Sequence, residues 1–73
     1  MKLVYDEADL ETQEAIRLVV LLLAAEMQPS REMDVLPAID FGYAECRPYW
    51  EEGGYPGLVL TLKGRQAAER WHK

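Results

Sequence analysis

The sequence predicts a small α+β domain, and three features of the 73-residue chain lead to that prediction. An apolar segment with polar, helix-like flanks occupies residues 7–27 and is closed by Pro29. Side chains alternate over residues 43–50, which precede a glycine-rich turn and a short return strand. A last segment, residues 62–72, places small side chains on one helical stripe. The length allows a single domain, residues 1–73.

The first helix is expected over residues 7–27, with Asp6 as its N-cap. Asp9 stands three residues later in a weak capping-box position, and acidic residues in a first turn suit the positive end of a helix. Residues 3–5, which are apolar, either add a strand to the sheet or form an N-terminal arm.

The second half of this helix is apolar on every side. Residues 18–25 carry no polar side chain, and at about 100° per residue they cover the whole circumference of a helix. Such a segment lies at the centre of a domain or in an interface. A buried strand is the competing interpretation, because Val19 and Val20 are β-branched. The residues assigned to self-association are Leu18, Val19, Leu22 and Leu23.

A short helix is predicted over residues 31–36, with Ser30 as a candidate N-cap. Pro37 then removes an amide donor and disfavours the helical region for the residue before it. Either the helix ends near Leu36, or Pro37 begins a second short turn that reaches Asp40.

The predicted sheet begins after Gly42, and the period of two over residues 43–50 indicates a strand. Pro48 makes this strand an edge or a bulge, and residues 51–57 form the turn. The return strand presents on one face Leu58, Leu60 and Leu62.

The last helix is expected over residues 62–72, capped by Thr61. Its inward stripe consists of Gly64, Ala67, Ala68 and Trp71. The three small residues let the helix approach the sheet closely, and Trp71 covers the end of the core.

The C-terminal part, residues 41–71, resembles winged helix-turn-helix proteins. In these proteins the return strand of the wing often ends in a pattern like LT-x-KGR, which this chain carries at residues 60–65. The resemblance covers less than half of the chain. It implies a winged-helix-like domain with a long first helix, a short middle helix, a two-stranded or three-stranded antiparallel hairpin and a C-terminal helix.

The segment before the hairpin departs from the family pattern. Winged-helix regulators read the major groove with a regular helix that follows a second helix and a tight turn. Residues 28–41 leave little room for both, and Pro37 falls where the reading helix belongs. The exposed candidates there include Glu32, Asp34 and Asp40. Their charge has the wrong sign for contact with phosphate.

Charge is unevenly distributed along a chain of net charge −5. Residues 1–60 carry four basic and twelve acidic side chains, whereas residues 61–73 carry four basic and one acidic. An acidic body repels nucleic acid. The cations that a DNA-binding role would use are Arg31, Lys63, Arg65 and Arg70. Cations in a last turn also complement the helix dipole, which accounts for part of this set without DNA.

The sequence contains no enzyme signature. His72 is the only histidine, and Cys46 is the only cysteine and is expected to be a buried, inert thiol. The glycine-rich turn lacks phosphate-loop spacing. We therefore expect no catalytic residue, no cofactor and no metal site. The run over residues 18–25 is far shorter than the roughly 20 residues of a membrane span, and no targeting segment is visible, so a cytoplasmic protein is expected.

Aromatic residues concentrate on the predicted hairpin, and such residues are enriched in protein interfaces. The face predicted to bind a partner consists of Tyr43, Arg47, Tyr49, Glu51, Glu52 and Tyr55. The alternative is that Trp50 and Trp71 belong to the core and the tyrosines are ordinary sheet residues.

These features favour a small, dimeric, non-enzymatic regulator or inhibitor that binds another protein, of the kind that phages and mobile elements encode. Its partner would be a host regulator or part of the nucleic-acid-binding machinery. The alternative is a dimeric winged-helix transcription regulator whose last helix lies near the DNA backbone. An acidic mimic of nucleic acid is a variant of the first class.

Overall fold

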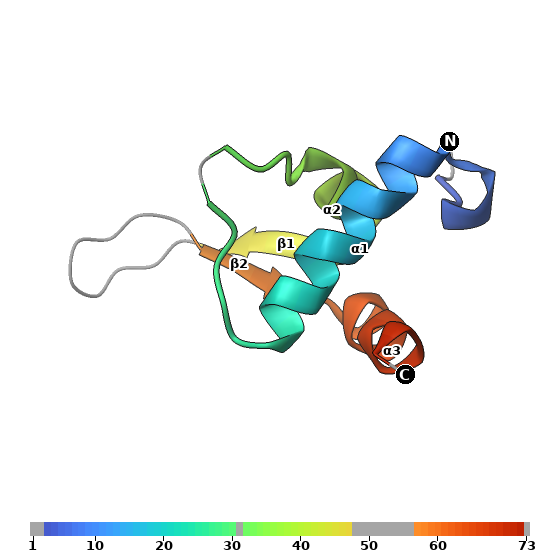
Figure 1. Cartoon of the computed structure of the whole chain (residues 1–73). Coiled ribbons are helices and arrows are strands. Elements are labelled where there is room, and N and C mark those ends of the chain that lie inside the picture. The colour runs from blue at the N-terminus through green and yellow to red at the C-terminus, as the bar shows by residue number, and fades with distance from the viewer. Residues whose placement is uncertain (1–2, 31, 48–56, 73) are drawn as a thin grey trace.

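The computed structural model describes residues 3–30, 32–47 and 57–72. The elements along the chain are a 3-10 turn η1 (Tyr5–Glu7), α1 (Leu10–Ala24), α2 (Leu36–Asp40), β1 (Ala44–Arg47), β2 (Gly57–Leu60) and α3 (Leu62–Trp71). β1 and β2 form a two-stranded antiparallel sheet, so the α+β prediction is confirmed (Figure 1). No helix within these three ranges combines the length and the apolar character that crossing a membrane requires.

The middle of α1 is the centre of the domain. Its inward side chains, Ile16, Val19 and Val20, have no exposed surface. One side of this stripe packs against α3 and Tyr43, and the other against α2 and the start of β1 (Figure 1). Each buried aliphatic side chain of this size contributes roughly 1.5–3 kcal/mol to folding. A helix was therefore the correct interpretation of this apolar segment, and the competing strand was wrong.

The start of α1 differs from the prediction. Asp9 is the N-cap instead of Asp6, because its Oδ1 accepts a hydrogen bond of 2.9 Å from the backbone N–H of Thr12. Hydrogen bonding by the Thr12 side chain, and then by its backbone N–H, lowers the pKa of the Asp9 carboxyl below its usual value of 3.8. The helix consequently begins at Leu10, three residues later than expected.

Of the two alternatives for residues 3–5, the added strand is wrong. Tyr5 instead begins η1, and its carbonyl accepts a hydrogen bond of 2.8 Å from Nε2 of Gln13 on α1. The Tyr5 ring packs between Tyr43 and Trp71, with centroid distances of 6.0 and 5.0 Å. The side chain of Tyr5 therefore fastens the N-terminal segment to the core through ring contacts and not through a backbone ladder.

α1 ends at Ala24, not at residue 27, because the backbone reverses at Glu26. Glu26 has a φ of 61°, and its N–H donates to the carbonyl of Leu23. The N–H of Met27 donates to the carbonyl of Leu22. This is the Schellman arrangement, which satisfies the last carbonyls of a helix. Proline at position 29 is thus not what ends the helix.

The helix predicted over residues 31–36 is also wrong, and the alternative in which Pro37 begins a turn that reaches Asp40 is confirmed. Pro37 lies in the first turn of α2. The N–H groups of a first turn have no partner within the helix, so the absence of an N–H at proline costs no helical hydrogen bond. The N–H of Leu36 donates a hydrogen bond of 3.2 Å to the Asp34 carboxylate.

In the hairpin, Ala44 lies opposite Leu60 and Cys46 lies opposite Leu58. Leu58 and Leu60 face the core, as predicted. Leu62 does not, since it begins α3 and is 68% exposed. The Cys46 side chain is exposed, so the buried thiol was a wrong prediction. Proline 48 and most of the predicted turn, residues 48–56, lie outside the described residues.

α3 follows β2 directly, and the prediction for this helix is confirmed. Thr61 caps it by accepting a hydrogen bond of 3.0 Å from the N–H of Gly64. Gly64, Ala67 and Ala68 are buried against α1 and the start of β1, and Trp71 packs on the same cluster. The stripe of small residues thus brings α3 close to the backbone at Tyr43.

Candidate functional site

Most of the predicted partner-binding face lies outside the described residues. This applies to Tyr49, Glu51, Glu52 and Tyr55. The backbone of Arg47 belongs to β1, and its side chain also lies outside the described part of the structure. The contact role of these five residues remains a prediction.

Tyr43 was wrongly predicted as an exposed anchor. Its side chain is only 3% exposed and packs in the core with Ile16 and Val20 of α1. Burial raises the pKa of its hydroxyl above the usual 10.0, although the positive charge of Arg70 acts in the opposite direction. Tyr43 precedes β1 and is buried like its neighbour Ala44, so the alternation predicted from residue 43 does not hold at the start of the strand.

The predicted self-association residues divide between the two sides of α1. Val19 is fully buried, and Leu23 packs against the buried cluster around it. Val19 does not face outward in this domain, so its assignment to a self-association surface was wrong, whereas Leu23 is half-buried. Leu18 is 53% exposed and Leu22 is half-buried.

The outward side of α1 carries an apolar stripe over its second half. At helical spacing the stripe consists of Leu18, Leu21, Leu22 and Ala25. We call these four residues the α1 stripe. Toward the N-terminus the same side of the helix carries Glu11 and Glu14, both exposed. The continuous apolar run in the sequence includes this stripe. The angular position of each residue around the helix is needed to separate Leu21 and Ala25 from the core positions.

The segment that precedes the hairpin offers no cation among its described residues. α2 has five residues, and its exposed side chains are Leu36, which is 62% exposed, and Asp40. Glu32 and Asp34 are exposed ahead of it. Arg31, the cation predicted there, lies outside the described residues. This segment therefore presents leucine and carboxylates to the solvent.

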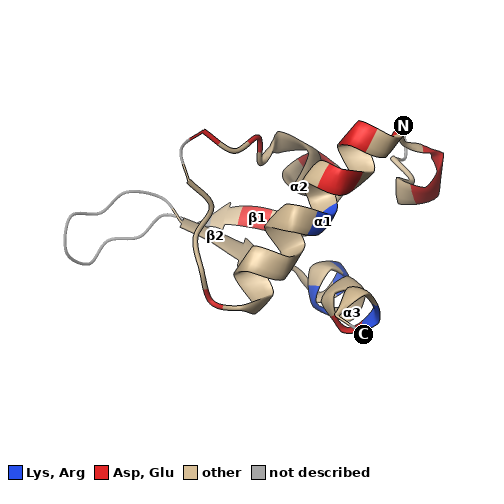
Figure 2. Ribbon diagram, viewed as in Figure 1, with Lys and Arg blue, Asp and Glu red and all other residues tan. Residues whose placement is uncertain are grey.

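The other cations predicted for DNA contact lie on α3, whereas acidic residues gather at η1 and the start of α1 (Figure 2). The α3 cations face two different sides of the helix. Arg65 lies with Glu69 on one flank of the buried stripe, and Lys63 lies with Arg70 on the other. They do not form one continuous basic surface.

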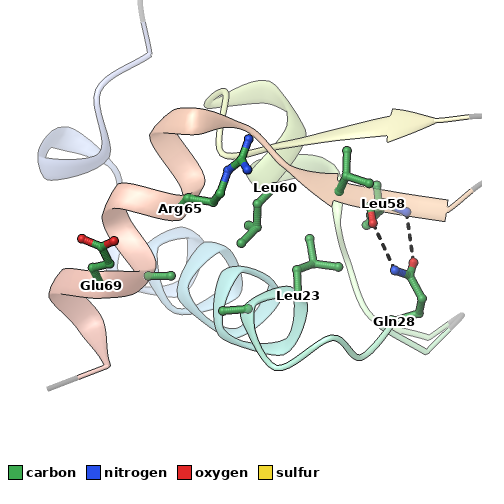
Figure 3. Close-up of a pocket in the computed structure, with 9 residues that line it drawn as sticks. Leu23, Gln28, Leu58, Leu60, Arg65 and Glu69 are labelled. Atoms are coloured by element: carbon green, nitrogen blue, oxygen red, sulfur yellow. Dashed lines mark hydrogen bonds between the residues drawn. The ribbon is translucent and has the colours of Figure 1, made fainter.

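On the Arg65 side, α1, β2 and α3 enclose a groove of about 630 Å³ (Figure 3). Leu23 and Leu60 point into it, and Arg65 and Glu69 lie along α3 at its rim. At its other end the side chain of Gln28 is bonded to the backbone of Leu58: Nε2 donates to the carbonyl and Oε1 accepts from the N–H, both at 3.0 Å.

On the opposite side of α3, three aromatic rings form a cluster. Tyr5, Tyr43 and Trp71 contact one another, with the Tyr43 and Trp71 centroids 5.6 Å apart. The Lys63 ammonium lies 4.6 Å from the Tyr43 centroid, and the Arg17 guanidinium lies 5.7 Å from that of Trp71. Sequence analysis missed the roles of Tyr5 and Arg17, since no motif connects them to the C-terminal helix.

A cavity of about 570 Å³ adjoins this aromatic cluster. The N-terminal segment and α3 line it, through Leu3, Val4, Tyr5, Asp6, Tyr43, Lys63, Arg70 and Trp71. Lys63 is held in place because its Nζ donates a hydrogen bond of 2.8 Å to the carbonyl of Phe41. The cavity thus combines fixed positive charge with aromatic surface.

Among the described residues, no group of three or more histidine, cysteine, aspartate or glutamate side chains is placed to hold a metal ion. The two cavities also differ in charge, since the groove pairs Arg65 with Glu69 and the aromatic cavity has two cations beside Asp6. Comparison of the chain with family models, curated proteins and solved structures gives no match.

Proposed function

We propose that this chain is a small regulator or inhibitor without enzymatic activity that acts by binding another protein, and that it is encoded by a phage or mobile element. We further propose that it does so as a homodimer on a degenerate winged-helix scaffold. The observation that carries the proposal is the segment before the hairpin, residues 32–40, which presents carboxylates and leucine where a reading helix would present cations.

The length of α2 supports this proposal. A five-residue α2 rises only about 7.5 Å at 1.5 Å per residue, whereas a recognition helix places several side chains along the major groove. Asp40 has the wrong charge for contact with phosphates, and the side chain of Leu36 can form no hydrogen bond with a base edge. The distribution of the α3 cations over two flanks further disfavours one footprint on a DNA backbone.

The α1 stripe supports self-association. Its members recur at positions i, i+3, i+4 and i+7, the spacing with which one helix packs on another. Leu18 of this stripe is 53% exposed. A second copy of the chain covers this stripe by the same surface on both molecules, the commonest arrangement in homodimers.

Fluorescence anisotropy with a labelled random-sequence duplex tests the functional class. A protein-binding regulator leaves the anisotropy unchanged at low salt. The alternative, a winged-helix transcription regulator, predicts saturable binding whose affinity falls steeply as salt rises. In that case, charge-neutralising changes at Lys63, Arg65 and Arg70 would reduce the salt slope.

Capture of a partner provides the second test. Immobilised protein is incubated with bacterial lysate, and retained proteins are identified by mass spectrometry. The predicted contact residues Tyr49 and Tyr55 are replaced by alanine in a parallel sample. A partner retained by the wild-type chain and lost with the double variant supports the proposal. Retention of the same proteins by both samples counts against the predicted hairpin face.

A further inference from the structure

We infer that the cavity beside the aromatic cluster binds a peptide segment of the partner in which a carboxylate stands next to an aromatic ring. This inference rests on the proposed function, because it names the kind of segment that a protein partner presents. It assigns the carboxylate to Lys63 and Arg70 and the ring to the apolar wall of the cavity.

The cavity carries an excess of positive charge. Lys63 and Arg70 line the cavity against the single carboxylate of Asp6, in a chain whose net charge is −5. The groove on the other side of α3 has one cation and one carboxylate, Arg65 and Glu69, which balance. A local excess of positive charge on an acidic protein attracts an anion to that place and not to the rest of the surface.

The ammonium of Lys63 is held in a fixed position beside the cavity. The helix dipole accounts for Arg70 in the last turn of α3, but it disfavours a cation in the first turn, where Lys63 lies. The Lys63 ammonium is held by the carbonyl of Phe41 and by the face of Tyr43. An ammonium has three donors, and the carbonyl takes one of them. The charge of Lys63 is therefore fixed beside the cavity before any ligand arrives.

The wall of the cavity is apolar and aromatic. Leu3 and Val4 are 41% and 42% exposed beside the rings of Tyr5 and Trp71, and together they offer apolar surface next to the two cations. The ring of Trp71 already contacts two tyrosines and the Arg17 guanidinium. A nucleotide base, which binds by stacking on an open ring face, is therefore less suited to the cavity than a side chain that lies against ring edges and aliphatic groups.

Two-dimensional ¹⁵N–¹H NMR with N-acetyl-Glu-Trp-amide as the probe tests the inference. We expect the peptide to shift the signals of Trp71, Lys63 and Arg70, and to leave those of Arg65 and Glu69 unchanged. The matched neutral peptide, N-acetyl-Gln-Trp-amide, should bind about tenfold more weakly, since it loses a charge-assisted hydrogen bond. Equal shifts with both peptides overturn the inference.

Two variants on the same helix separate the cavity from the groove. Arg70→Gln should weaken binding of the acidic peptide about tenfold, whereas Arg65→Gln should change it by less than about twofold. Both side chains are exposed, so the folded spectrum of each variant serves as its own control. Equal losses in the two variants contradict the assignment, because the attraction then reflects overall charge.

Two further probes distinguish the source of the anion. If free indole-3-acetate or adenosine monophosphate binds and the acidic peptide does not, the assignment of a peptide as the ligand is overturned. Failure of this inference can be distinguished from failure of the proposed function. If a partner is captured equally well by the Arg70→Gln variant, the inference fails and the regulator proposal stands. If no partner is captured while the acidic peptide still binds this cavity, the regulator proposal fails and the cavity remains a ligand site.

Discussion

The backbone carbonyl of Tyr43 occupies the space that a β-carbon on Gly64 would fill. Helix α3 can lie this close to the start of β1 only because residue 64 has no side chain. Gly64→Ala should therefore destabilise the domain, although alanine is favoured over glycine in a helix by about 1 kcal/mol. Overpacking against a backbone atom costs roughly 1–3 kcal/mol or more. We expect a net loss of about 1–2 kcal/mol in urea unfolding.

The control for this prediction is Gln66→Ala, which lies on the exposed side of the same helix. Its effect should be within about 0.5 kcal/mol of zero, as is usual for surface positions. If Gly64→Ala were as stable as Gln66→Ala, the close approach between α3 and Tyr43 would not exist in solution.

Replacing Leu18 by glutamate should dissociate the proposed dimer, because it places a charge within the α1 stripe. Light scattering at low micromolar concentration measures the mass, which for one chain is 8.4 kDa. Leu62→Glu is the matched control, since Leu62 is 68% exposed on α3, away from this stripe. A wild-type mass of one chain under the same conditions would remove the dimer from the proposal.

The hydrogen bond between Asp9 and Thr12 makes stability depend on pH at the acidic end. The folded pKa of Asp9 is lowered from 3.8, so the carboxylate stabilises the domain above pH 3.8, and this contribution is lost as the pH falls through the folded pKa. Asp9→Ala should unfold at lower urea concentration at neutral pH, with a difference from wild type that narrows under acid. Asp9→Asn, which can also cap a helix, should retain most of the stability without that pH dependence.

The raised pKa of the Tyr43 hydroxyl predicts the opposite dependence at the alkaline end. Its folded pKa is raised above 10.0, so its contribution to stability is complete below pH 10.0 and is lost as the pH rises through the folded pKa. Melting temperatures from pH 8 to 11 should therefore fall more steeply for the wild type than for Tyr43→Phe. Parallel curves for the two proteins would mean that the hydroxyl ionises as freely in the folded state as in the unfolded state.

Local rules were sufficient to predict α3. Thr61 and the stripe of Gly64, Ala67 and Ala68 are close in sequence, and capping with helix phase defines them. The N-terminal boundary could not be obtained in this way, because Asp6 and Asp9 are both good caps. The choice between them depends on the ring of Tyr5, which reaches Trp71, 66 positions further along the chain.

The candidate site was predictable only in part, for the same reason. Helix phase distinguishes the flank with Lys63 and Arg70 from the flank with Arg65, and it could have been applied to the sequence. The aromatic wall could not, since Tyr5 and Tyr43 meet α3 through tertiary packing. Burial of Tyr43 also shows why aromatic residues on a predicted hairpin cannot be assigned to solvent from alternation alone.

The two hydrogen bonds between Gln28 and Leu58 also help this small sheet to avoid aggregation. A strand whose outer N–H and C=O groups are unpaired is a template on which other chains can add as further strands. The amide of Gln28 presents a donor and an acceptor in the spacing of a peptide unit, and it occupies both groups of Leu58. A single side chain thus stands in for a neighbouring strand, and it protects the sheet from fibre-like growth at that position without adding another strand to the fold.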